Sequence, residues 1–240
     1  MKNKIELIGV YGDDETIACS AWTSTYRKLT EDKKKRIPEM LESLWSNGHE
    51  TPFEKGIVHF LVDSEIASHI HILKHRIASI NGESSRYKEL KEDKFFLPED
   101  WIGIGVNREV LFEEDKNLNW YLHLTSQKDS DWYNILKDYN ELGNKLYHQC
   151  LKDLTPILGR KRAKESARFF KTYSSQIEVD IMFNMRSFAN FMKLRDSKHA
   201  QKEIREIAQE MFKQLKELPN FKKTLEIFEK YNIEEKENKE

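Results

Sequence analysis

Hydrophobic and polar positions alternate over two short stretches in the first part of the chain. Residues 4–10 (KIELIGV) alternate, and residues 56–63 do so more regularly, which places three side chains on one face: Val58, Phe60 and Val62. Alternation of this kind is typical of half-buried strands. Between the two stretches, apolar residues recur at helical spacing over residues 31–47, and Asn47-Gly48 supplies a stop signal. The pattern predicts a strand–helix–strand beginning.

Beyond residue 64 the apolar spacing is mainly helical. Residues 95–130 are irregular, and we expect a loop there, with short strands as the alternative. Helical spacing occurs in six segments: 64–76, 132–150, 160–170, 183–195, 199–217 and 221–231. Residues 234–240 are all charged or Asn, and we expect this tail to fray. We therefore predict one α+β domain over residues 1–233, with a helical C-terminal half, and a charged tail over residues 234–240.

Composition narrows the class of protein. The chain has 240 residues, of which only 9 are glycine, and this scarcity favours helices over a many-stranded sandwich. Forty Lys and Arg against 41 Asp and Glu leave a net charge of −1, so no domain-wide basic field would attract nucleic acid. No apolar run approaches the roughly 18 residues that span a bilayer. Two cysteines cannot build a disulfide framework, which favours a reducing, cytoplasmic location.

The densest polar cluster is KHRIASINGESSRY, residues 74–87. It combines Lys74, His75, Arg76 and Arg86 with adjacent serines and a glycine. Arginine forks and backbone amides both suit an oxyanion, so this composition is typical of a phosphate site. The alternative is a solvated surface loop, and composition alone does not decide between them.

A second unusual segment lies at residues 184–204. Phe188, Phe191 and Met192 define an apolar stripe, and Arg195 and His199 continue it at helical spacing; Asn190 lies one turn beyond Arg186. Buried polar groups are costly unless a partner satisfies them. We expect this helix to bury polar side chains against a ligand, or alternatively against a carboxylate of the fold.

Metal and thiol chemistry find little support. His71 and His75 are four residues apart, as two helical zinc ligands would be, but no HExxH pattern and no third ligand accompany them. We therefore predict no metal site. Neither Cys19 nor Cys150 has a setting that would activate a thiolate.

The first cluster resembles the signature of the flavin-dependent thymidylate synthases. That family has Arg-His-Arg, then Ser, then Arg-Tyr, and the matching residues are Lys74-His75-Arg76, Ser84 and Arg86-Tyr87. Ser79 and Asn81 also stand where the family has Ser and Asn. The match therefore includes both residue types and spacing.

Two further motifs extend the resemblance. HETPFEK at residues 49–55 is similar to the family's His-x-Thr-Pro-Phe-Glu segment. Residues 184–204 are similar to its Asn-x-Arg-Ser, Leu-Arg and His-Ala-Gln-x-Glu-Ile run. The three motifs occur in the family's order.

The resemblance implies a fold and an activity. The fold would be α+β, with a central, mostly antiparallel sheet flanked by helices. The activity would be reductive methylation of dUMP to dTMP, with methylenetetrahydrofolate as carbon donor and FAD, reduced by NADPH, as the hydride source. The enzyme would be an NADPH-oxidising methyltransferase without a cysteine nucleophile. It would form a homotetramer with shared active sites and would bind neither nucleic acid nor membrane.

The resemblance also implies site residues. Arg195 would be catalytic, facing the pyrimidine and favouring its deprotonated form. The positions that match FAD contacts are Ser24, Thr51, Glu54, Lys74, His75, Arg76, Asn81, Asn184, Arg186, Asn190 and His199. Those that match dUMP contacts are His71, Lys74, Gly82, Glu83, Ser84, Ser85, Arg86, Arg168 and Arg195.

Several positions depart from the family pattern. Lys74 replaces the first Arg and loses its bidentate fork. Gly82 stands where the family usually has Glu, so that the carboxylate role either shifts to Glu83 or is met by backbone contacts. His71 stands where a Gln often contacts dUMP. Two alternatives therefore accompany the enzyme hypothesis: a weakened relative that binds only flavin or nucleotide, and a nucleic-acid-binding module, which the balanced charge argues against.

Overall fold

The computed structural model describes residues 2–84, 86–105 and 131–237, with side chains of the last helix described as far as Tyr231. These residues form two compact units. We call the first, made of the described parts of Met1–Asn3, Ser64–Ala67 and Glu83–Ile177, the helical unit. We call the second, made of the described parts of Lys4–Asp63, Ser68–Gly82 and Glu178–Glu240, the sheet unit. The protein is α+β, as the sequence predicted.

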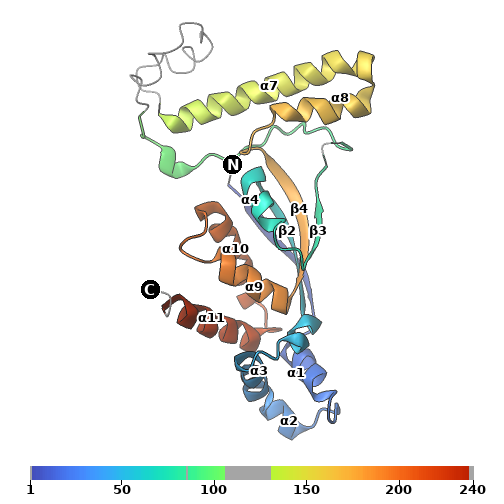
Figure 1. Cartoon of the computed structure of the whole chain (residues 1–240), viewed down its shortest axis with the longest axis vertical. Coiled ribbons are helices and arrows are strands. Elements are labelled where there is room, and N and C mark those ends of the chain that lie inside the picture. Colours follow the sequence, from blue (N-terminus) through green and yellow to red (C-terminus); the bar gives the residue numbers. More distant parts are fainter. Residues whose placement is uncertain (1, 85, 106–130, 238–240) are drawn as a thin grey trace. The chain divides into compact units, whose positions relative to one another are not determined.

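Four strands form one sheet in the order β1-β2-β4-β3. Their bounds are Lys4–Tyr11 for β1, Ile57–Glu65 for β2, Ser79–Gly82 for β3 and Gln176–Asn184 for β4. β1 pairs antiparallel with β2, and β3 pairs antiparallel with β4 (Figure 1). The predicted inner face of β2 is confirmed, because its three named side chains are fully buried: Val58, Phe60 and Val62.

Helices make up most of the rest of the sheet unit. They are α1 (Asp14–Trp22), α2 (Glu31–Lys35), α3 (Ile37–Ser46), α4 (Ile66–Ile72, whose first two residues belong to the helical unit), α9 (Met185–Arg195), α10 (Lys202–Lys216), α11 (Lys222–Glu237) and the 3-10 helix η1 (Thr51–Lys55). α9 and α10 lie side by side against one face of the sheet (Figure 1). Stacked phenylalanines fill the space between, with Phe188 of α9 at 6.1 Å from Phe60 and 6.0 Å from Phe183 between ring centroids.

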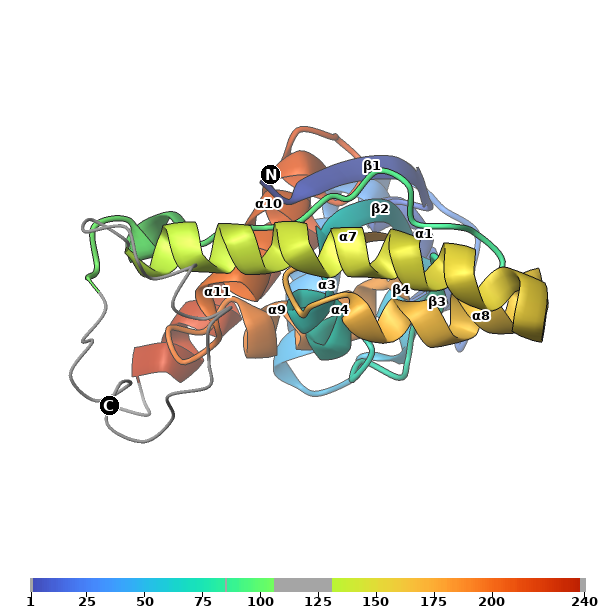
Figure 2. The same ribbon diagram turned by 90° about the horizontal axis from the view of Figure 1, so that it is seen from above.

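A long helix and a short one form the main part of the described helical unit. α7 (Trp132–Leu158) runs beside α8 (Arg160–Ala167), as Figure 2 also shows, and the two are joined at Gly159, whose φ of 76° favours glycine. The short 3-10 helices η2 (Glu99–Trp101) and η3 (Arg168–Phe170) complete the unit. Lys171 has a buried ammonium, which is held by Asp93 at 2.8 Å and lies over the ring of Tyr147.

The boundaries of the predicted helices were partly wrong. Residues 183–184 belong to β4, α8 ends at Ala167 where the 3-10 helix η3 follows, and α10 spans Lys202–Lys216 instead of residues 199–217. The segment 31–47 forms two helices rather than one, because Pro38 in the first turn of α3 has no amide hydrogen to continue α2. The first two residues of segment 64–76 belong to β2, α7 continues past Cys150 to Leu158, and α11 continues past residue 231 to Glu237. The fraying of the tail stays a prediction, and residues 238–240 lie outside the described residues. Among the described helices, none is both long and apolar enough to cross a membrane.

Gly56 provides a test of the packing. A Cβ at this position would lie 2.7 Å from Phe221 and 2.8 Å from Met185, so Gly56→Ala forces two core side chains to move. We expect a loss of about 1–3 kcal/mol in the free energy of unfolding, measured by urea denaturation. Gly9→Ala is the matched control, since nothing lies within 4 Å of a Cβ there. Equal stability of the two variants would contradict this account of the core.

Candidate active site

Arg195 and His75 meet although 120 residues separate them in the sequence. β4 continues into α9, which carries Arg195 at its last turn, and α4 leads into the loop that carries His75. The Nε of Arg195 donates to the Nε2 of His75 at 2.9 Å. His75 is buried and lies edge-on to Phe191, with 4.9 Å between ring centroids. The structure therefore joins the predicted catalytic arginine to a residue predicted to contact the flavin.

The environment of this pair keeps the imidazole neutral. Burial, together with the nearby positive charges of Arg195 and His71, lowers the pKa of His75 to about 4. Because Nε2 accepts the hydrogen bond from Arg195, the ring proton must be on Nδ1. Burial also lowers the pKa of Arg195. Arg195 is therefore a half-buried cation whose hydrogen-bond acceptor, His75, is uncharged. A neutral acceptor does not cancel the positive charge of Arg195.

Arg186 makes a different kind of contact. Its Nε donates to Glu50 at 2.9 Å and its guanidinium NH1 to Glu54 at 2.8 Å. These hydrogen bonds raise the pKa of Arg186, and the one to Glu54 has the largest effect. Arg186 and Glu54 were both predicted to contact FAD, and the structure brings them together. Glu50 was missed, and only its position one turn before Glu54 could have indicated it.

Among the predicted dUMP residues of the helical unit, Arg86 contacts α8, which is rich in lysine and arginine. The Nε of Arg86 donates to Glu165 of α8 at 2.8 Å, and Glu83 pairs with Lys88 at 2.8 Å. Ser84 accepts weakly, at 3.4 Å, from the backbone amide of Arg86. Ser85 lies outside the described residues. Nothing in the sequence indicated Glu165, which accepts a hydrogen bond from one donor of Arg86 in this structure.

Three predicted cations have no carboxylate partner among the described residues. Lys74 and Arg76 flank His75 in the sheet unit, and Arg168 begins η3 in the helical unit; all three side chains are exposed. Most of the surface cations around Arg168 are paired, as in Arg160 with Glu89 at 2.6 Å. Exposed cations without internal partners are free to bind an anion.

The other predicted residues are dispersed over the sheet unit. Asn184 caps α9 by accepting from the Ser187 amide at 2.8 Å, and His71 contacts Gln201 at 3.3 Å. Gly82 ends β3 beside the exposed Asn81. Two further FAD positions, Ser24 and Thr51, are exposed.

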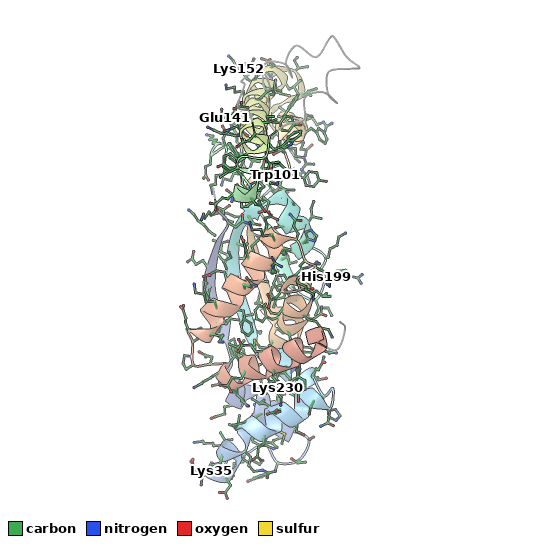
Figure 3. The ribbon with its side chains drawn as sticks, turned by 90° about the vertical axis from the view of Figure 1, so that its left-hand side faces the viewer. Lys35, Trp101, Glu141, Lys152, His199 and Lys230 are labelled. Atoms are coloured by element: carbon green, nitrogen blue, oxygen red, sulfur yellow. The ribbon has the colours of Figure 1, made fainter. Side chains whose placement is uncertain are left out.

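The prediction that α9 buries its polar continuation was wrong for two residues. Asn190 and His199 are exposed in the single chain, and only Arg195 is half-buried. For His199 the reason is that α9 ends at Arg195 and the chain turns before α10 begins at Lys202, so the helical stripe does not continue that far. Asn190 lies within α9, on the exposed side of the helix. Figure 3 shows His199 on the outside of the ribbon.

The chemistry of these residues is that of anion binding and polarisation. Unpaired cations, serines and backbone amides suit phosphates, and a half-buried arginine suits a developing negative charge. No three His, Cys, Asp or Glu side chains gather as a metal site within the described ranges. Fold and residues together define a class: an α+β protein whose two units each carry arginines suited to phosphorylated ligands.

Comparison with known proteins identifies the family. A model of the family described as thymidylate synthase complementing protein matches residues 6–219. A flavin-dependent thymidylate synthase of Thermosipho melanesiensis is 31% identical over 235 residues, covering 96% of this chain and 92% of the relative. A flavin-dependent thymidylate synthase of Kosmotoga olearia is 31% identical over 209 residues, covering 86% and 82%. The chain belongs to the thymidylate synthase complementing protein family, as the three motifs predicted.

A solved structure shares the fold. The crystal structure of a UMP/dUMP methylase from Streptomyces cacaoi with bound 5-Br dUMP superimposes with a TM-score of 0.71 and 24% sequence identity. The match covers 95% of this chain and 94% of that chain. The α+β architecture is therefore that of a known protein along almost its whole length.

The neutral state of His75 can be tested by NMR. With a pKa of about 4, its ring signals should not shift between pH 8 and pH 5. Because this value lies below the roughly 6.5 of an unfolded histidine, its contribution to stability is complete above pH 6.5 and is lost as the pH falls towards 4. Arg195→Met removes a nearby positive charge and should raise the pKa of His75. A wild-type midpoint above pH 6 would contradict the assignment; the signal is assigned by its absence in His75→Gln.

Proposed function

We propose that the protein is a flavin-dependent thymidylate synthase that methylates dUMP to dTMP. The observation that carries the proposal is the Arg195–His75 pair, because it holds a half-buried, uncompensated cation beside the residues of the family motif. Family membership and the names of the relatives support the same activity. When bound, the reduced flavin supplies the hydride and methylenetetrahydrofolate the carbon, so the protein mainly binds, orients and polarises.

Arginine side chains and a serine hydroxyl would together hold the nucleotide. Arg168, which has no carboxylate partner within the described chain, and Arg86 would bind the phosphate together with the Ser84 hydroxyl. Phosphate binding by Arg86 requires either its free guanidinium nitrogens or exchange of its contact with Glu165. Arg195 would contact the pyrimidine and stabilise its negative charge, since a low-dielectric site strengthens that attraction.

The residues present also fit FAD. Lys74 and Arg76 are exposed and make no ion pair with a described carboxylate, so they can meet a pyrophosphate. The Arg186 side chain, fixed by Glu50 and Glu54, would present its remaining N–H groups at a set position. NADPH and methylenetetrahydrofolate complete the proposed set of ligands, with no residue assigned to either.

The cysteines support a route without a thiol nucleophile. Burial, followed by the negative charge of Glu15, raises the pKa of Cys19, which disfavours the reactive thiolate. Cys150 is partly buried within α7 and has no hydrogen-bonded base in the part of the chain that the structure describes. Ser84 likewise contacts no side chain that would activate its hydroxyl among the described residues, so we assign it to binding.

We also propose a homotetramer. Four large apolar side chains of α7 are between 37% and 49% exposed and follow one stripe of the helix: Trp132, Tyr139, Leu142 and Leu146. Exposed apolar stripes of this kind commonly mark subunit interfaces. This surface supports assembly of several copies, with active sites that draw on more than one chain.

Anaerobic turnover tests the proposed function. We expect the purified protein to be yellow, to be bleached by NADPH and to form dTMP from dUMP and methylenetetrahydrofolate. Arg195→Ala should retain the fold by circular dichroism and lower kcat/KM by roughly a hundredfold or more, as losing a transition-state donor does. Protein that cannot bind FAD would refute the enzyme. Flavin and dUMP binding without dTMP would instead favour the weakened relative.

The phosphate contact can be tested separately. Arg168→Ala should raise the Kd for dUMP by roughly tenfold to a hundredfold, because a charge-assisted hydrogen bond is lost. Deoxyuridine, which lacks the phosphate, should bind the variant and the wild type equally well. Isothermal titration with both ligands gives the comparison. A similar loss of affinity for deoxyuridine would mean that Arg168 does not act on the phosphate.

A further inference from the structure

His69 is the one histidine of its segment whose side chain has no hydrogen-bond partner within the described residues. His59, His71 and His75 contact Asp180, Gln201 and Arg195 respectively. The ring of His69 lies in α4 and is half-buried, and its Nδ1 is fully buried without a partner. A buried unpaired polar atom costs about 1–3 kcal/mol, and an unpaired donor is the less favourable case, which bears on where the ring carries its proton.

The ring lies against Gly82, the last residue of β3. A Cβ at position 82 would lie 3.2 Å from Cε1 and 3.5 Å from Nε2 of His69. Gly82 does not have a positive φ, so its backbone conformation does not require glycine. The close approach of the imidazole gives the reason for a glycine, because any other residue would begin its side chain in that space.

The surroundings indicate which nitrogen carries the proton. Burial lowers the pKa of His69, so the ring is neutral near pH 7 and carries one N–H. A proton on Nδ1 would be a buried donor with no acceptor, which is unfavourable. Nε2 is not fully buried and faces the Gly82 side, so it is the favoured position of the proton. The ring therefore presents a hydrogen-bond donor beside the end of β3.

Gly82 also leaves a carboxylate position vacant. The family usually has Glu at this position, and the resemblance led us to expect that its role shifts to Glu83 or is met by backbone contacts. Glu83, however, pairs with Lys88 at 2.8 Å and its side chain is only 12% exposed. The group that occupies the space next to Gly82 is a donor from α4 rather than a carboxylate acceptor.

We propose that His69 is a specificity residue that donates from Nε2 to a carbonyl oxygen of the pyrimidine of dUMP, with Gly82 allowing the ring to reach it. The inference rests on the proposed function, which assigns dUMP to the segment that begins at Gly82. A neutral donor suits a carbonyl oxygen and discriminates against a base that presents a donor at the same place.

Isothermal titration with dUMP tests the role of the donor. His69→Leu should weaken dUMP binding by roughly threefold to tenfold, the range of one hydrogen bond between neutral groups. His69→Gln should bind within about twofold of the wild type, since its amide N–H can stand in for Nε2–H. Deoxyribose 5-phosphate, which has no base, should bind all three proteins equally. Thermal unfolding verifies that each variant is folded.

A double-mutant cycle tests the contact with Gly82. Gly82→Ala should weaken dUMP binding in the wild-type background but not in the His69→Ala background, because the added methyl group then meets no imidazole. The same loss in both backgrounds would overturn the steric part of the inference.

The outcomes separate this inference from the function on which it rests. Unchanged dUMP binding by His69→Leu overturns the inference alone, provided that the wild type binds dUMP and forms dTMP. Equal losses of affinity for dUMP and for deoxyribose 5-phosphate in His69→Leu would assign His69 a structural role and would also overturn the inference. A His69→Leu variant that loses FAD but still binds dUMP normally would overturn it as well. A wild type that neither binds dUMP nor forms dTMP refutes the proposed function itself.

Discussion

The hydrogen bond between Arg195 and His75 is the contact on which the candidate site depends. The contact forms only if α9, which follows β4 and carries Arg195, lies next to the loop that follows β2 and α4 and carries His75. Both groups are costly to bury alone, and each reduces that cost for the other. Phe191, one turn before Arg195, packs on the imidazole and connects the pair to the phenylalanine core. Core packing and site geometry are therefore set by the same helix.

The distribution of ion pairs separates two roles for arginine and lysine. Arg186 and Arg86 are held by carboxylates within their own units, which fixes their side chains at known positions. Lys74, Arg76 and Arg168 have no such partner among the described residues and remain free for ligand anions. A net charge of −1 conceals this division, because paired and unpaired cations contribute equally to the sum. Position, rather than total charge, produces the anion-binding character.

The sequence predicted the fold well where one local rule dominated. Alternation identified β1 and β2, and Gly48, with a φ of 72°, ends the segment after α3 as expected. It failed where two rules competed, as at Pro38, where a missing amide hydrogen outweighed helical spacing. It also failed for His199, because periodicity cannot show that a helix ends at Arg195, and for Asn190, which lies on the exposed side of α9. Glu50 and Glu165 escaped notice since charged residues are common on surfaces and only their partners distinguish them.

The sequence by itself determined the family: three motifs indicated it, and the match of the family model to residues 6–219 confirmed it. It also determined the α+β class, because periodicities of two and of three to four residues are properties of the local chain. Only the tertiary structure decided which of these residues meet. The 2.9 Å contact across 120 residues, the neutral state of His75 and the approach of His69 to Gly82 all follow from packing between distant segments. Spacing along the chain carries no information about such distances or about the burial that shifts a pKa.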